Sequence, residues 1–248
     1  MSRLRGILTD PLLSVVMPVY NEAAGVADVV AEVRRHVLDE VPSSELVLVD
    51  DRSTDETREV LGRIALDDPR LRLLVNDVNL GHGPTVRRAL DASVGEWIFH
   101  LDSDGQVDAA EFATLWGLRA DHDLVLGVRA DRHDPVHRLV LTRATRALVS
   151  VLARRRVQDA NVPFKLIRRS LYEHLAPTIP PTAFAPSILL VLGAYRSGAR
   201  VAEVEITHFP RQHGRSTLRL GRLGIAAGRS TLQTLRFARR PVPRYEHR

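Results

Sequence analysis

LVLVDDRSTDET at residues 46–57 and GEWIFHLDSDGQ at residues 95–106 decide the fold of this chain. In each stretch a short apolar run, typical of a buried strand, ends in closely spaced aspartates. The residues STDE at 53–56 then provide caps and acidic side chains for the first turn of a helix. A strand followed by a polar turn and a helix is the unit from which parallel sheets are built.

The same alternation continues in both directions along the chain. The residues at 81–83 (GHG) are interpreted as a turn, and the proline-rich segment 177–186 is expected to interrupt any helix. Strands and helices that alternate at this spacing indicate βαβ units, and so an α/β fold with a mostly parallel sheet flanked by helices. Strands are expected at 12–19, 46–49, 71–75, 97–101, 124–128 and 201–206, and helices at 22–37, from 53 to about 66, at 85–93, up to about 154 and at 187–195.

Length and composition set the limits of the interpretation. The chain has 248 residues, of which 44% are hydrophobic, enough for one large α/β domain and an appendage. That apolar fraction excludes a wholly disordered or fibrous protein. Because the chain contains 0 cysteines, disulfides, thiolate zinc sites and a cysteine nucleophile are excluded as well.

The charge is basic and unevenly distributed. There are 35 Lys and Arg residues against 30 Asp and Glu residues, and Lys165 is the only lysine. Basic residues become denser after Arg129 and again after Arg211, whereas the front half carries the aspartates. Arginine suits phosphate, nucleic acid or an anionic membrane surface. Since aromatic residues make up only 5%, the stacking surfaces that nucleic-acid binding needs are not expected.

The N-terminal residues give no sign of a targeting segment. Residues 1–10 lack the apolar core of a secretory signal, and no apolar run approaches the roughly 20 residues that a membrane-spanning helix requires. A cytoplasmic location is therefore expected, with peripheral contact on the inner face of the cell membrane left open.

The pair Asp102 and Asp104 is the sharpest chemical feature. The carboxyl ends of parallel strands are where α/β sheets bind ligands, and Asp102 directly follows such an end. Two carboxylates separated by one residue can hold a hard divalent cation with its bound diphosphate, and Gln106 can add a neutral oxygen. A single pair of this kind is also common in solvated turns, so the pattern alone leaves both readings open.

Asp50 and Asp51 end a second strand. The capping of the next helix explains residues 53–55 but not two consecutive carboxylates. A carboxylate at this place can accept hydrogen bonds from a base or a ribose hydroxyl. Neither a G-x-G-x-x-G fingerprint nor a P-loop is present, which excludes dehydrogenase and P-loop functions.

Together, these motifs resemble the GT-A fold glycosyltransferases of family 2. The stretches that carry the resemblance are SVVMPVYNE (14–22), LVLVDDRSTDET (46–57), NLGHGPTVRRAL (79–90), GEWIFHLDSDGQ (95–106), LVLGVR (124–129), RHDPVHR (132–138), DANVPFKLIRRSL (159–171) and GARVAEVEITHFPRQHGRST (198–217). They span roughly residues 12–220 in the expected order, and the most similar branch is that of the polyprenyl-phosphate mannose or glucose synthases.

The resemblance implies a role for individual residues. Arg211, Gly214 and Ser216 match a loop that closes over the diphosphate and the acceptor phosphate, although Thr217 stands where the family often has a lysine. A Mg²⁺ or Mn²⁺ ion is implied at Asp102, Asp104 and Gln106. The catalytic residues implied are Asp104, Asp159 and Arg211, and those implied for donor binding are Pro18, Tyr20, Glu22, Val49, Asp51, Asp102, Ser103, Arg129, Gly214 and Ser216.

Three further polar residues have more than one interpretation. Asp159 is either a carboxylate that deprotonates the acceptor, one that orients the sugar or an arginine, or an acidic surface residue. His100 lies in a predicted strand and is interpreted as a hydrogen-bonded core histidine. His82, between two glycines, is the histidine expected to touch a ligand.

The leading hypothesis is an inverting enzyme that moves a hexose from a GDP- or UDP-linked sugar to a polyprenyl phosphate. The alternatives are a transferase for a water-soluble glycan or small acceptor, and a nucleotide-sugar binding module without activity. Residues 1–210 are expected to form the GT-A domain. Residues 211–248 are expected to form the phosphate-binding loop and a basic amphipathic extension, which either contacts a membrane or a membrane partner protein, or packs one face on the domain.

Overall fold

A computed structural model describes residues 11–129, 136–209 and 220–247 of the chain. Within them, seven strands form one sheet in the order β3-β2-β1-β4-β6-β5-β7. Only β6 runs antiparallel to its neighbours β4 and β5, so the predicted mostly parallel sheet is confirmed. The strands are β1 (Leu13–Val19), β2 (Ser44–Asp50), β3 (Leu71–Val75), β4 (Trp97–Leu101), β5 (Leu124–Arg129), β6 (Phe164–Arg168) and β7 (Val201–Ile206).

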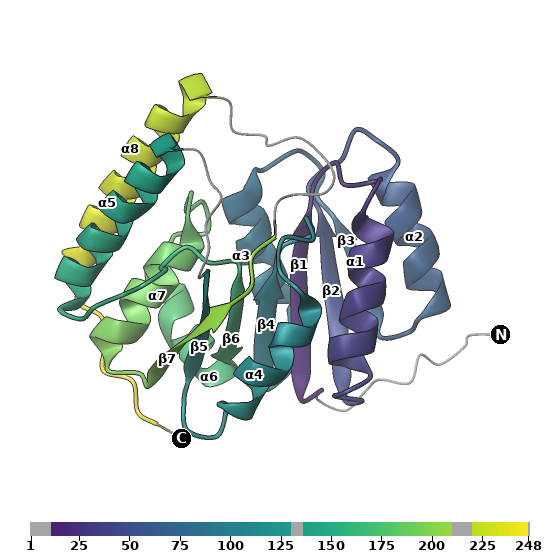
Figure 1. Ribbon diagram of the computed structural model, residues 1–248, viewed down its shortest axis with the longest axis horizontal. Coiled ribbons are helices and arrows are strands. Elements are labelled where there is room, and N and C mark those ends of the chain that lie inside the picture. Colours follow the sequence, from purple (N-terminus) through teal and green to yellow (C-terminus); the bar gives the residue numbers. More distant parts are fainter. Residues whose placement is uncertain (1–10, 130–135, 210–219, 248) are drawn as a thin grey trace.

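Helices cover both faces of the sheet, and two more form an outer layer (Figure 1). Helices α1, α2 and α4 lie on the near face, and α3 and α6 lie behind the strands and contact α7. Helices α5 and α8 run side by side and pack on α7. The helices are α1 (Val26–Val33), which continues as a π-helical turn (Arg34–Leu38), α2 (Thr57–Asp67), α3 (His82–Ala92), α4 (Phe112–Gly117), α5 (Val136–Ala153), α6 (Arg169–Leu175), α7 (Pro186–Ser197) and α8 (Leu220–Ala238), and short 3₁₀ turns lie at Ala109–Glu111 and Ala176–Thr178.

The core of the molecule is the sheet itself. Every residue of β1 and β2 is buried, which explains why these strands have continuous apolar runs instead of an alternating pattern. Both faces of each strand are covered by helices, and this is the usual environment of parallel strands. The order of the strands reverses beside β1, where β2 lies on one side and β4 on the other. Ligands of open α/β sheets bind at the carboxyl ends of strands at such a reversal.

The structure corrects the interpretation of residues 81–83 as a turn. Gly81 has a φ of 85°, and α3 begins at the next residue, so His82 and Gly83 are helical. Gly83 has a different reason to be glycine, because an added Cβ would lie 2.3 Å from the carbonyl oxygen of Ala183. Helix α3 therefore packs directly on the backbone that leads into α7.

Sequence patterning missed three elements, namely β6, α4 and α6. Strand β6 contains Lys165 among apolar residues, and α4 and α6 are too short for a helical period to be visible. The predicted strands at 71–75, 97–101 and 201–206 have the observed bounds.

The C-terminal residues belong to the same core. Phe237 and Tyr245 are 2% and 5% exposed and lie in the main hydrophobic cluster. The Tyr245 hydroxyl is 2.7 Å from Ser170 Oγ, and the Tyr245 N–H donates to the carbonyl oxygen of Ser197 at 2.9 Å. Helix α8 thus packs one face on the domain, while Ile225 and Leu235 are exposed on its outer side. No helix within the described part of the chain is long and apolar enough to cross a membrane.

Candidate functional site

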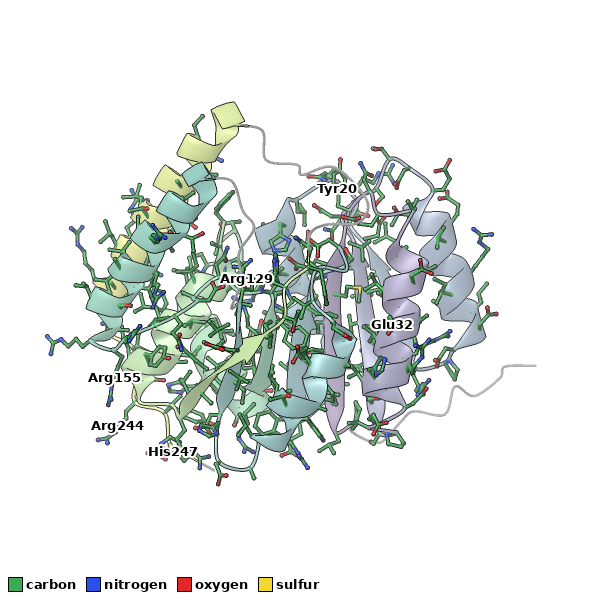
Figure 2. All side chains as sticks on the ribbon, viewed as in Figure 1. Tyr20, Glu32, Arg129, Arg155, Arg244 and His247 are labelled. Atoms are coloured by element: carbon green, nitrogen blue, oxygen red, sulfur yellow. The ribbon has the colours of Figure 1, made fainter. Side chains whose placement is uncertain are left out.

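A cavity of about 940 Å³ opens at the carboxyl ends of β4 and β5, next to the point where the sheet reverses its strand order. Asp102 and Asp104 line it beyond the end of β4, Arg129 lines it at the end of β5, and Asp159 faces it from the loop before β6. In Figure 2 Tyr20 marks the carboxyl end of β1, and Arg129 lies between that end of the sheet and the paired helices α5 and α8. Gln106 lines the cavity as well, so the cavity brings together five of the predicted site residues.

Asp102 has one oxygen turned toward two histidines. Its Oδ1 is 3.7 Å from His100 Nε2 and 4.0 Å from His82 Nε2, while the side chain as a whole remains 25% exposed. Burial by itself raises the pKa of this carboxyl, but His82, His100 and Lys165 outweigh it, and the pKa lies below its usual value. Asp102 is therefore kept as an anion at the edge of the cavity.

The turn after Asp102 holds Asp104 and Gln106 together. The Gln106 N–H donates to Asp104 Oδ1 at 3.2 Å, and Gln106 Nε2 donates to the carbonyl oxygen of Phe209 at 3.3 Å. A backbone bond from the Phe209 N–H to the Gln106 carbonyl oxygen, 2.8 Å long, joins the two segments again. The 207–209 segment is thus fixed beside the aspartate pair.

The donor atoms at this turn suit a hard divalent cation. Asp102, Asp104 and Gln106 offer carboxylate and amide oxygens, which Mg²⁺ and Mn²⁺ prefer. No group of three or more His, Asp and Glu side chains within residues 11–129, 136–209 and 220–247 forms a closed metal cage. A few protein ligands are typical of cations that also bind substrate phosphates, so the residues present fit such an ion.

Asp159 and Arg129 form a buried ion pair. Arg129 Nε donates to Asp159 Oδ2 at 2.8 Å, and the Asn161 N–H donates to Asp159 Oδ1 at 3.2 Å. Asp159 is only 3% exposed, which is incompatible with an acidic surface residue. Of its possible roles, holding an arginine is the one that corresponds to a contact in the structure.

Asp51 is buried and its carboxylate holds the loop before α3. Its Oδ1 accepts from Asn76 Nδ2 at 2.7 Å and from the Leu80 N–H at 2.8 Å, and its Oδ2 accepts from the Gly81 N–H at 2.8 Å. These contacts set the start of α3, whose first residues line the cavity. The predicted contact of Asp51 with base and ribose stays a prediction.

The other described residues that were predicted to bind the donor do not line the cavity. Pro18 and Val49 are buried and face each other across β1 and β2. Glu22 and Ser103 are 6% exposed, and Tyr20 is partly exposed at the end of β1. Their roles stay predictions.

The predicted phosphate loop lies outside the described residues. This applies to Arg211, Gly214 and Ser216 alike. The last described residue before them is Phe209, which is bonded to Gln106.

The sequence analysis missed the far wall of the cavity. This wall is formed by α5 and α8, and within the described part of the chain its three arginines form no ion pair. The only sequence signal was the density of basic residues after Arg129 and Arg211, which gave no positions. The residues of this wall are Leu141, Thr142, Thr145, Arg146, Ala226, Ala227, Arg229, Ser230, Leu232, Gln233 and Arg236.

The prediction that His100 is a core histidine is confirmed, but in the described part of the chain the predicted hydrogen bonding is not found at its Nε2 atom. The side chain is 1% exposed, but His100 Nε2 has no hydrogen-bond partner among the described residues. Burial lowers its pKa to about 4. Lys165, its neighbour across β4 and β6, was not considered as a site residue, and burial lowers the pKa of this amine to about 7.

Solved structures similar to this one are GT-A glycosyltransferases. Glucosyl-3-phosphoglycerate synthase from Mycobacterium tuberculosis, in complex with UDP, superposes with a TM-score of 0.69 at 21% identity, over 93% of this chain and 81% of that protein. The mannosyltransferase PcManGT from Pyrobaculum calidifontis, in complex with GDP-Man and Mn²⁺, superposes with a TM-score of 0.61 at 21% identity, over 84% of this chain and 59% of that one. At these identities the likeness establishes the fold.

Curated relatives share more of the sequence. Glycosyltransferase AglD of Haloferax volcanii is 29% identical over 80% of this chain and 33% of its own length. Dodecaprenyl-phosphate galacturonate synthase of Rhizobium johnstonii is 28% identical over 85% of this chain and 62% of its own. Undecaprenyl-phosphate 4-deoxy-4-formamido-L-arabinose transferase of Pseudomonas aeruginosa is 28% identical over 83% and 60%. The chain thus spans between one third and less than two thirds of these relatives.

The sequence profile of one family extends over most of the sheet. It matches residues 14–183, which include β1 to β6 and every described residue that was predicted to bind the donor or the cation. Because the match covers more than half of the chain, the protein belongs to glycosyl transferase family 2.

Proposed function

We propose that this protein is an inverting glycosyltransferase that moves a hexose from a nucleotide sugar to a polyprenyl phosphate, with Mg²⁺ or Mn²⁺ as cofactor. Two of the relatives named above carry a polyprenyl phosphate in their names. The observation that carries the proposal is the two-sided cavity, with carboxylates at one end and, at the other, apolar side chains and arginines that form no ion pair within the described residues.

The arginine wall suits a phosphate that is attached to a hydrocarbon chain. Arg146 on α5 and Arg229 and Arg236 on α8 line the cavity without a carboxylate partner among the described residues. Leu232 and Phe184 line the same cavity, and their side chains are 48% and 38% exposed to solvent. A guanidinium group binds phosphate through paired hydrogen bonds, and apolar side chains beside it favour an isoprenoid tail.

The chemistry needs little from the protein beyond binding and orientation. An oxygen of the acceptor phosphate attacks the anomeric carbon, the bond from that carbon to the nucleotide diphosphate breaks, and its electron pair leaves with the diphosphate. A cation held by Asp102, Asp104 and Gln106 would neutralise charge on the leaving diphosphate. Because a phosphate oxygen is already ionised near neutral pH, no general base is required. In this proposal Arg129, which lines the cavity and is held by Asp159, orients the sugar nucleotide.

The outer face of α8 is suited to a membrane surface that carries the acceptor. Ile225 and Leu235 are exposed on α8 without lining the cavity, and Arg239 is exposed directly after the helix. Apolar and basic side chains on one exposed helix favour binding to anionic lipid at the level of the headgroups. Peripheral membrane association is therefore part of the proposal.

The decisive experiment measures nucleotide release from UDP-glucose, GDP-mannose and related donors. Each donor is tested with and without Mn²⁺ or Mg²⁺, and with a polyprenyl phosphate, inorganic phosphate or a water-soluble glycan as acceptor. We expect turnover only when cation and polyprenyl phosphate are both present. Turnover with a water-soluble acceptor alone would contradict the lipid acceptor, and donor binding without any turnover would indicate a binding module.

Variants locate the acceptor site. Arg229→Gln and Arg236→Gln are expected to raise the KM for the polyprenyl phosphate about tenfold each and to leave the KM for the donor unchanged. Arg239→Gln is the matched control, since Arg239 is exposed directly after α8 and does not line the cavity. Equal effects of all three variants would show that only the overall charge matters.

A further inference from the structure

Lys165 is the only lysine in a chain that otherwise uses arginine for its 35 Lys and Arg positions. It lies on β6, between His100 of β4 and Leu126 of β5. Its side chain is 1% exposed and belongs to the largest fully buried side chains of the protein. Lysine is almost never fully buried unless it is paired, so a specific reason for this residue is needed.

Lys165 and two other residues of this region each have a buried polar atom that lacks a hydrogen-bond partner within the described residues. These atoms are Lys165 Nζ, His100 Nε2 and Asp102 Oδ1. The last two atoms are 3.7 Å apart, which is too long for a hydrogen bond. Most buried polar atoms in proteins are bonded to protein or to ordered water. Such a group of donors and acceptors provides the partners that a buried water needs.

Lys165 also stands in the field of two of the carboxylates that line the cavity. Asp102 and Asp159 attract its side-chain nitrogen, and Arg129 repels it. Lys165 does not line the cavity itself. Its buried amino group therefore acts on Asp102 and Asp159 from outside the lining of the cavity.

We propose that Lys165 is a positioning residue of the donor site, which, together with His100 and a buried water, fixes the inward oxygen of Asp102 and turns the carboxylate toward the cavity. The inference rests on the proposed function, because it assigns Asp102 to donor binding. A lysine suits this place better than an arginine. Its compact amine has a single nitrogen to satisfy, whereas a guanidinium group would bury three nitrogens and a larger planar group in a packed sheet.

The single lysine allows a test on the unaltered protein. Lysine labelled with ¹³C and ¹⁵N gives one side-chain signal, that of Lys165. We expect this signal to shift when UDP or GDP is added with Mg²⁺, because Asp102 is then engaged on its other side. An unchanged signal at saturating nucleotide, with binding confirmed by calorimetry, would overturn the proposal.

Lys165→Met removes the amine and keeps the length of the side chain. We expect at least a tenfold weaker affinity for UDP or GDP with Mn²⁺ in calorimetry, a similar rise in the KM for the donor, and a kcat within about threefold of the wild type. Lys165→Ala with added propylammonium, which can occupy the space left by the side chain, is expected to regain part of the affinity.

Leu166→Met is the matched control. Leu166 is the next residue on β6, is fully buried and points to the opposite face of the sheet. It is expected to leave nucleotide affinity unchanged. A merely structural role of Lys165 predicts equal losses of stability in both variants and unchanged nucleotide affinity in Lys165→Met, which would overturn the inference. A wild type that binds no nucleotide would instead overturn the proposed function.

Discussion

Arg129 Nε lies 2.8 Å from Asp159 Oδ2, and this ion pair joins the end of β5 to the loop before β6 at the edge of the cavity. Asp159→Asn would leave a partly buried guanidinium without its counter-charge. We expect kcat/KM to fall about 10- to 100-fold through misplacement of Arg129. Steady-state kinetics with a polyprenyl phosphate acceptor measures the loss.

The pH profile separates this role from general-base catalysis. A variant that has lost only the orientation of Arg129 keeps the shape of the wild-type kcat profile, since an ionised phosphate needs no base. Loss of an ionisation from the profile in Asp159→Asn would identify Asp159 as a base.

Asp104 is predicted to bind the cation and the diphosphate. Asp104→Asn is expected to reduce metal-dependent turnover about a thousand-fold, because charge neutralisation at a leaving diphosphate is worth several kcal/mol. Asp108→Asn is the matched control: Asp108 accepts from the Ala110 N–H at 2.9 Å as a helix cap, and asparagine caps equally well. Activity retained in Asp104→Asn would contradict its role as a ligand.

Gly83 is required by close packing between α3 and the segment before α7. In Gly83→Ala the new Cβ would lie 2.3 Å from the Ala183 carbonyl oxygen and 2.5 Å from that of Phe184, so backbone must move. We expect the free energy of unfolding to fall by about 1–3 kcal/mol in urea titrations. In the control Gly62→Ala, where nothing lies within 4 Å, it should rise by about 0.5–1 kcal/mol.

Asp123 is a buried carboxylate at the opposite end of the sheet from the cavity. Burial raises its pKa, but side-chain and backbone hydrogen bonds from Arg200 outweigh it and hold the pKa below 3.8. Because the pKa of Asp123 is lower in the folded than in the unfolded state, its ionised carboxylate stabilises the fold fully at a pH above the ordinary carboxyl pKa. This stabilisation is lost as the pH falls through the pKa of the folded state. Asp123→Asn should lower the free energy of unfolding at pH 7 by about 3 kcal/mol and flatten its decline in acid.

The control for this prediction is Asp121→Asn, since Asp121 is exposed two residues away. It should change the free energy of unfolding by less than about 0.5 kcal/mol. The measurement is the free energy of unfolding of both variants between neutral and acid pH. If it declines in acid as steeply in Asp123→Asn as in the wild type, the stabilising role of the ionised Asp123 is contradicted.

The exposed face of α8 is predicted to bind anionic membranes. Ile225 is 62% exposed on α8 and does not line the cavity. Ile225→Glu removes apolar area and adds a repelled charge, so the affinity for vesicles that contain anionic lipid should fall at least about tenfold in co-sedimentation. Leu66→Glu is the control, because Leu66 is 87% exposed on α2, away from α8. An equal loss in both variants would show that α8 is not the contact surface.

The sheet was largely predictable, because its strands are short, apolar and bounded by turn residues. Strand β3 at Leu71–Val75 and β7 at Val201–Ile206 have the predicted bounds. Strand β6 was not predicted, because Lys165 interrupts its apolar pattern. The start of α3 was mistaken for a turn, since a glycine needed for close packing looks like a turn glycine in the sequence.

By itself, the sequence determined the α/β fold and the aspartates at the ends of β2 and β4. Such information is local: apolar periodicity and the polar residue after a strand are properties of adjacent positions. Only the tertiary structure decided which of these groups meet. It paired Arg129 with Asp159, used Asp51 to hold the loop before α3, and buried Lys165 within the field of Asp102. These contacts join residues far apart in the chain, and their partners are selected by strand order and burial, which no local pattern records.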